Sequence, residues 1–292
     1  MGSMASRVLE GLRQRLSSSA VALLLFLAAV PASAMHELEH GKAVGVIRPV
    51  SLSETAWGLL SLPASMEAED RVAGILLLGD GESVLDGRSE LYAQRLLSLG
   101  FGVLDADFDG LVADEGTPAH PNVEPVGRRL GLTLAALDHG AELDPGRVAV
   151  IGIGLGARAV LEGWAEHGGA LRAAVLVYPG CDAGLIARAP ALRPQPGQGR
   201  ILLVHGDLDE AEAAQCADLV AALGGAERGV ARYVLRGADA GWDIDGGELD
   251  ARSYIPDPAN PARRRAAQPD DARAAIALDR MLIFLMGALD PQ

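Results

Sequence analysis

The pattern of hydrophobic and polar positions from residue 72 onward predicts buried strands that alternate with amphipathic helices. Residues 72–78 form an unbroken apolar run, which is typical of a strand buried on both faces of a sheet. Residues 85–99 carry apolar side chains at helical spacing and stop at Gly100, a residue type that commonly ends helices. The same alternation continues along the chain. It predicts further strands at 101–104, 147–151, 173–178, 201–204 and 231–235, the last strand, and further helices at 126–137, 157–167, 211–223 and 270–286.

Two other stretches complete the predicted organisation. Residues 43–62 alternate loosely between apolar and polar positions, which predicts one or two leading strands, and residues 179–199 are rich in Pro and Gly, which predicts a loop. Strands and helices alternating at this spacing predict an α/β fold with a mostly parallel central sheet and helices on both faces. No internal repeat or linker divides the chain, so we expect a single domain over residues 35–292.

The first 34 residues predict a secretory signal peptide. Arg7, Arg13 and Arg15 precede an uncharged apolar run over residues 20–30, and small residues at 32–34 suit a signal peptidase. The apolar run is shorter than the about 20 residues that a membrane span needs, although an uncleaved anchor is the alternative. We therefore expect an exported protein, periplasmic or secreted, with no stable membrane insertion after the signal is cleaved.

Charge and composition exclude several classes of function. The chain has 25 Lys and Arg against 39 Asp and Glu, a net charge of -14, and only 4% aromatic residues. A surface this negative repels phosphate backbones, and few aromatic rings are available for base stacking, so we expect no nucleic-acid partner. Two cysteines are too few for a disulfide-dense scaffold or a Cys-based zinc module. The apolar residues recur in periodic blocks, which excludes a disordered chain.

A predicted strand that runs through three alternate glycines into a helix is the most distinctive local feature. Residues 152–156 read Gly-Ile-Gly-Leu-Gly. A dinucleotide-binding fingerprint would place its third glycine three residues after the second, where this chain has Ala157, and would lie at the first strand of its unit. The alternative is a nucleophile elbow, Gly-x-Ser-x-Gly, whose central residue has a strained backbone. The flanking glycines fit that pattern, and Gly154 stands where Ser or Cys would be.

Four further segments lie at predicted strand ends. They read Leu-Leu-Gly-Asp-Gly at 77–81, Tyr-Pro-Gly-Cys at 178–181, His-Gly-Asp-Leu-Asp at 205–209 and Gly-Ala-Asp-Ala-Gly-Trp-Asp at 237–243. Together with the elbow they resemble the dienelactone hydrolase family of the α/β-hydrolase fold, from about residue 41 to the C-terminus. The resemblance implies, in the same order, the segment that lends a backbone N–H to the oxyanion hole, the turn after the strand that follows the elbow, the acid loop and the histidine loop.

Mapped onto that family, two of the three catalytic positions are changed. The nucleophile position holds Gly154, the acid position holds Asp209 and the histidine position holds Ala240. Glycine has no atom that can form a covalent acyl intermediate, and a methyl group cannot take up the nucleophile's proton. Asp209 keeps the acid position but has no imidazole to orient. Whether the two replacements are natural or engineered is left open.

The mapping leads to one expected function and two alternatives. We expect a pseudohydrolase without a cofactor that binds a small molecule or a protein partner. An oxyanion-type group of backbone N–H donors would remain, from Leu155 and from Gly79 or Asp80. The first alternative is an active ester or lactone hydrolase with a rearranged nucleophile, such as Cys181 with His205 as base, or a positioned water. The second is an interaction module.

Two smaller patterns concern the cysteines and a possible metal. Cys181 and Cys216 both follow predicted strands, so an exported protein could join them in a disulfide; two buried thiols are the alternative. Asp105, Asp107 and Asp109 open a calcium-loop pattern, but its twelfth position, normally Glu, is glycine. We therefore expect a solvated acidic loop and no metal.

Overall fold

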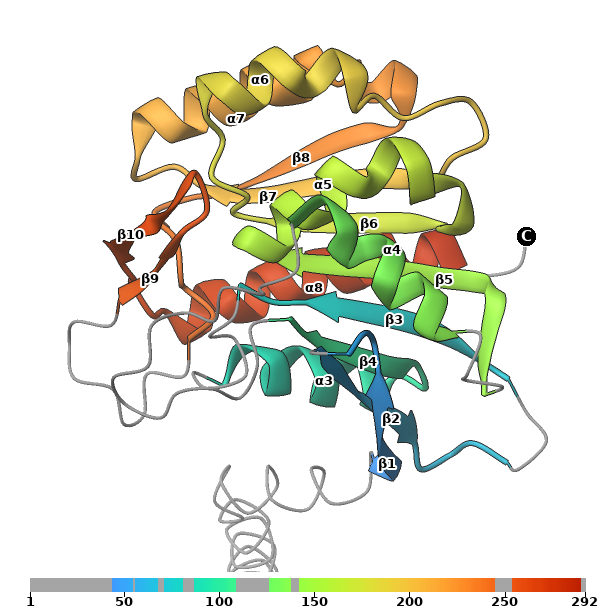
Figure 1. Cartoon of the computed structure of the whole chain (residues 1–292). Helices are drawn as coiled ribbons and strands as arrows, with labels where there is room; N and C mark the ends of the chain where they lie inside the picture. The colour runs from blue at the N-terminus through green and yellow to red at the C-terminus, as the bar shows by residue number, and fades with distance from the viewer. Residues whose placement is uncertain are drawn as a thin grey trace, which may run out of the picture. The chain divides into compact units, whose positions relative to one another are not determined.

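A mixed eight-stranded sheet runs through this computed structural model (Figure 1). The structure describes residues 44–54, 56–67, 71–80, 87–108, 126–137, 142–244 and 254–289. The predicted signal peptide lies outside these residues. The strands are β1 Val44–Ser51, β2 Trp57–Pro63, β3 Val72–Leu78, β4 Gly102–Asp107, β5 Leu143–Ile153, β6 Ala173–Val177, β7 Arg200–Gly206 and β8 Val230–Leu235.

The strand order across the sheet is β1-β2-β4-β3-β5-β6-β7-β8. Strand β2 pairs antiparallel with both β1 and β4, and every other pair in the sheet is parallel. Strands β4, β3, β5, β6, β7 and β8 therefore end at the same edge. That edge carries the turns after β3, β5, β6, β7 and β8, in which the resemblance places the catalytic positions.

Helices cover both faces of the sheet, as the sequence predicts. Leu76 and Leu78 pack toward one face, whereas Ile75 and Leu77 pack toward the other, which is why β3 is apolar throughout. The first face carries α4 Val126–Ala136, α5 Leu155–His167, α6 Ala183–Arg188 and α7 Glu210–Ala222, and the second carries α3 Arg88–Ser98 and α8 Asp271–Leu289 (Figure 1).

The structure corrects the sequence prediction in two places. The segment 179–199, predicted as a loop, contains helix α6, whose first turn is capped by the Asp182 side chain accepting from the Leu185 N–H at 2.8 Å. A helix of six residues is too short to show periodicity. Strand β8 is not the last strand, because β9 Tyr254–Asp257 and β10 Asn260–Ala266 form a separate antiparallel pair. Strand β10 is largely exposed and has no apolar alternation that would reveal it.

No helix in the described part of the chain combines the length and apolar character needed to cross a membrane.

Candidate functional site

Strand β5 passes into helix α5 through a tight turn at Gly154, which has φ 56° and ψ −115°. The Gly154 N–H donates to the carbonyl of Val177 at 2.9 Å, which joins the turn to the end of β6. The two flanking glycines are required by crowding. A Cβ at Gly156 would lie 1.8 Å from the Leu78 carbonyl oxygen, and a Cβ at Gly152 would lie 2.5 Å from the backbone of helix α5. The local backbone thus has the elbow geometry that the glycine pattern predicts.

The carboxylate of Asp80 lies where a nucleophile side chain would project from this elbow. A Cβ built on Gly154 would be 3.0 Å from Asp80 Oδ2 and 3.2 Å from Asp80 Cβ. Asp80 follows strand β3 and is 4% exposed. The space above the elbow is therefore filled by a side chain of the protein itself.

Replacing Gly154 with alanine is expected to lower the free energy of unfolding by about 1–3 kcal/mol, because φ near +56° strains a residue that has a Cβ. The added methyl group would also press on Asp80. Urea unfolding followed by circular dichroism measures the loss. Gly169→Ala is the matched control, since a Cβ there has nothing within 4 Å and φ is ordinary. Equal stability of the two variants would contradict the strained geometry.

Arg88, the first residue of helix α3, forms a two-pronged ion pair with Asp80. Its Nη1 donates to Oδ2 at 2.8 Å and its Nη2 donates to Oδ1 at 2.9 Å. Both side chains are fully buried. Bidentate geometry is the strongest arrangement open to a guanidinium and a carboxylate, and burial makes each charge dependent on the other.

The ion pair continues into a buried hydrogen-bond network. Arg88 Nη1 also donates to the Tyr178 hydroxyl at 3.0 Å, and that hydroxyl donates to Asp243 Oδ1 at 2.7 Å. Tyr92 donates to the other oxygen of Asp243 at 2.6 Å. The ring of Trp242 packs edge-on against Tyr178, with 4.8 Å between ring centroids. Tyr178 is the non-glycine residue with positive φ (34°) among the described residues, so this network holds a strained backbone in place.

Electrostatics keep the two tyrosines as neutral hydrogen-bond donors. Burial raises the pKa of Tyr92 and of Tyr178 well above the usual value. Burial also raises the pKa of Asp243, an effect opposed first by Arg88 and then by the two hydroxyl groups that donate to it. The side chains of this network therefore pair with one another, and the network offers no unpaired nucleophile among the described residues at the elbow.

The acid and histidine positions lie together but do not form a catalytic pair. Asp209 is exposed at the start of helix α7, where its Oδ1 accepts from the Glu212 N–H at 3.0 Å as an N-cap. Ala240 is buried, and its carbonyl accepts from the Gln268 N–H at 3.1 Å. Both line a cavity of about 10 Å³, far too small for an ester substrate. Asp209 thus has a structural role that does not need a histidine.

His205 lies beside this cavity and is 2% exposed. Its Nδ1 contacts the Gly206 carbonyl at 2.7 Å, while its Nε2 has no hydrogen-bond partner among the described residues. Burial lowers the pKa of His205, which favours the neutral imidazole. The alternative nucleophile, Cys181, is bonded to Cys216 in a disulfide, so it has no thiol to be activated. The structure therefore gives no support to the proposed Cys181–His205 pair.

The backbone segments expected to supply oxyanion donors do meet at the elbow. Leu155 begins helix α5, and Gly79 and Asp80 directly follow strand β3. A Cβ at Gly156 would lie 2.6 Å from the Gly79 carbonyl oxygen, which shows how closely the two segments approach. The Asp80 carboxylate, however, lies close to the position of a Cβ on Gly154, so its side chain takes up space that a substrate at the elbow would need.

The candidate calcium ligands lie largely in a strand. Asp105 and Asp107 belong to β4, and Asp109 is outside the described residues. Asp105 accepts from the Ser89 hydroxyl at 3.3 Å, and burial raises its pKa to about 6. In the part of the chain that the structure describes, no group of three or more His, Cys, Asp or Glu residues is placed to hold a metal ion.

The sequence did not lead us to predict the contribution of helix α3 to the buried network beside the elbow. Arg88, Tyr92 and Leu96 are spaced four residues apart on the buried side of helix α3. The sequence does contain one indication of this network, a charged residue in line with the apolar side of a predicted helix. Burying a lone charge is costly, so such a residue implies a buried partner. Trp242, in the segment matched to the histidine loop, is fully buried.

Comparison with solved structures identifies the fold of this chain. No protein-family model and no curated protein matches the chain. Among solved structures, a putative dienelactone hydrolase from Klebsiella pneumoniae subsp. pneumoniae is 17% identical, with a TM-score of 0.56 over 82% of this chain and 98% of that one. Dienelactone hydrolase from Anabaena variabilis is 18% identical, with a TM-score of 0.58 over 84% and 98%. Thermogutta terrifontis esterase 2, solved phosphoramylated by tabun, is 14% identical, with a TM-score of 0.59 over 86% and 97%. The chain therefore has the α/β-hydrolase fold, as its resemblance to dienelactone hydrolases implied.

Proposed function

We propose that this chain is an exported pseudohydrolase, which uses an α/β-hydrolase scaffold to bind a small molecule or a protein partner and does not hydrolyse esters. The observation that carries the proposal is the Asp80 carboxylate, which lies over Gly154 and is held there by an ion pair with Arg88 in which both side chains are fully buried. Acyl transfer needs an attacking atom, a base and room for the substrate. The described residues at the elbow supply none of the three.

The loops around the former acid position support a binding role. Arg265 of strand β10 forms ion pairs with Glu212 at 2.7 Å and with Asp239 at 2.5 Å, which ties the start of α7 to the loop after β8. Beside them lies a pocket of about 420 Å³. Its lining includes Asp182, Asp209 and both acidic partners of Arg265. A concave surface on fixed loops suits recognition without chemistry.

An esterase assay on the full chain tests the catalytic part of the proposal. We expect no hydrolysis of p-nitrophenyl acetate or butyrate above the buffer rate, and no covalent labelling by a fluorophosphonate probe, in parallel with an active esterase as positive control. Turnover that is lost in Asp209→Asn but kept in Asp279→Asn, a change at an exposed position on helix α8, would overturn the proposal.

Fractionation of the cells that produce the protein tests export. We expect the mature chain outside the cytoplasm, with N-terminal sequencing starting near Met35. A full-length chain confined to the cytoplasm would contradict this part of the proposal.

A further inference from the structure

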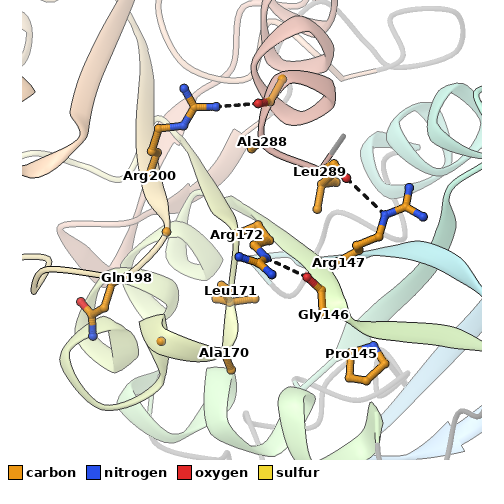
Figure 2. A pocket seen from close by; sticks show the side chains of 14 residues that line it. Pro145, Gly146, Arg147, Ala170, Leu171, Arg172, Gln198, Arg200, Ala288 and Leu289 are labelled. Carbon is orange, nitrogen blue, oxygen red and sulfur yellow. Dashed lines mark hydrogen bonds between the residues drawn. The ribbon is translucent and has the colours of Figure 1, made fainter. Parts of the chain in front are cut away.

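A hollow of about 740 Å³ lies at the sheet edge opposite the elbow, where strands β5, β6 and β7 begin. The C-terminal end of helix α8 forms one side of it (Figure 2). This volume is in the range of sites that hold small molecules. The hollow lies far from every position that the resemblance assigns, so nothing about it depends on whether the protein is a pseudohydrolase.

The charge of the hollow is the reverse of that of the whole chain. Its described lining residues include Arg147, Arg172 and Arg200 and no Asp or Glu. The chain as a whole carries a net charge of -14. Three arginines around one hollow, with no carboxylate among the described lining residues, create a local positive field that would attract an anion.

Each of the three arginines donates one hydrogen bond to a backbone carbonyl, as Figure 2 shows, and Arg200 also lies over the Phe284 ring, 5.3 Å from its centroid. Arg172 Nε donates to Gly146 at 2.7 Å. Arg147 Nε donates to Leu289 at 3.2 Å, and Arg200 Nη2 donates to Gly287 at 3.0 Å. None of the three forms an ion pair with a carboxylate among the described residues. A guanidinium has five N–H donors, so most of their hydrogen-bonding capacity is left for a ligand.

Capping of helix α8 accounts for only part of this arrangement. Gly287 and Leu289 are among the last residues of α8, and their carbonyls need donors from outside the helix. Arg172 contributes nothing to α8, because its bond goes to Gly146, near the start of strand β5. Capping also does not explain the open space beside two glycines that line the hollow. A Cβ at Gly169 or at Gly197 would meet nothing within 4 Å.

We propose that this hollow binds a small anionic molecule through phosphate or carboxylate groups. Planar guanidinium groups match both kinds of oxyanion and bind them with paired hydrogen bonds. Three arginines contributed by the starts of three neighbouring strands favour a ligand with more than one anionic group. The rigid sheet edge fixes their backbone positions before the ligand arrives, which reduces the entropy cost of binding.

Calorimetric titration of the full chain with inorganic phosphate, pyrophosphate and citrate tests the proposal. Titration with chloride at the same ionic strength is the control. We expect saturable binding of pyrophosphate or citrate, and the tighter of the two distinguishes a phosphate ligand from a carboxylate ligand. Arg172→Gln should weaken binding about tenfold, the effect of losing hydrogen bonds to a charged group. Arg193→Gln is the matched control, because Arg193 is also exposed and also donates through Nε to a backbone carbonyl, but lies outside the hollow.

A second pair of variants separates binding from folding. Gly169→Asp would place a carboxylate at a residue that lines the hollow, with room for the added side chain, and Gly169→Asn adds nearly the same volume without charge. Both should fold and melt alike without ligand, whereas only the aspartate variant should lose binding. The proposal is overturned if none of the three anions binds beyond the chloride control, or if Arg172→Gln and Arg193→Gln bind equally.

Discussion

Replacing Arg88 with methionine is expected to lower the free energy of unfolding by about 3–5 kcal/mol, the largest effect of any single change considered. The substitution removes the bidentate partner of Asp80 and leaves that carboxylate buried without its cation. It also removes a donor to Tyr178 and the positive charge that opposes the raised pKa of Asp243. Urea unfolding at pH 7 measures the loss.

Two comparisons make this result specific to the buried pair. Arg188→Gln breaks an ion pair with Glu162 in which Arg188 is 54% exposed, and it should change stability by less than about 1 kcal/mol. The double variant Arg88→Met, Asp80→Leu should recover much of the loss, because removing both charges costs less than removing one. An Arg88→Met variant as stable as the Arg188→Gln variant would mean that the pair is not buried as described.

Reducing the Cys181–Cys216 disulfide is expected to lower the free energy of unfolding by about 4 kcal/mol. The bond closes a loop between residues 35 apart, and the chain-entropy model gives this magnitude for such a loop. Both residues are buried, at 3% and 0% exposure, so reduction requires local opening. Urea unfolding with and without dithiothreitol measures the effect.

A Cys181→Ala, Cys216→Ala double variant is the control for the reductant. It should unfold near the midpoint of the reduced wild-type protein and should not respond to dithiothreitol. If the wild-type midpoint is unchanged by complete reduction, with two thiols detected by alkylation, the disulfide does not contribute to stability as expected.

Much of the backbone could be predicted from the sequence because the apolar pattern and the glycines constrain it directly. The unbroken run in β3 reflects burial on two faces, and Gly154 occupies a backbone conformation that other residues adopt only under strain. These are local constraints. The separate β9–β10 pair escaped prediction because β10 is held by backbone hydrogen bonds and buries little side-chain surface.

The side chain that lies over Gly154 could not be predicted, because its position depends on contacts between segments that are distant in the sequence. Asp80 lies in a segment matched to an oxyanion-hole motif, which pointed to its backbone N–H and not to its side chain. Tyr178 and Asp243 are 65 residues apart and lie in different loops, yet one hydrogen bond joins them. Sequence patterns along one element report its own periodicity and carry little information about such pairings.

The interdependence of the buried groups also bears on which sequence changes could open the elbow of the proposed pseudohydrolase. Changing Asp80 alone to open space above Gly154 would leave the Arg88 charge buried without its partner. Changing Arg88 alone would leave the Asp80 charge unpaired and remove the cation that opposes the raised pKa of Asp243. Each first step toward an accessible elbow thus crosses a less stable intermediate sequence. Under the proposed function, a change toward an esterase would therefore be opposed by the loss of folding stability, in addition to needing a nucleophile and a base at positions 154 and 240.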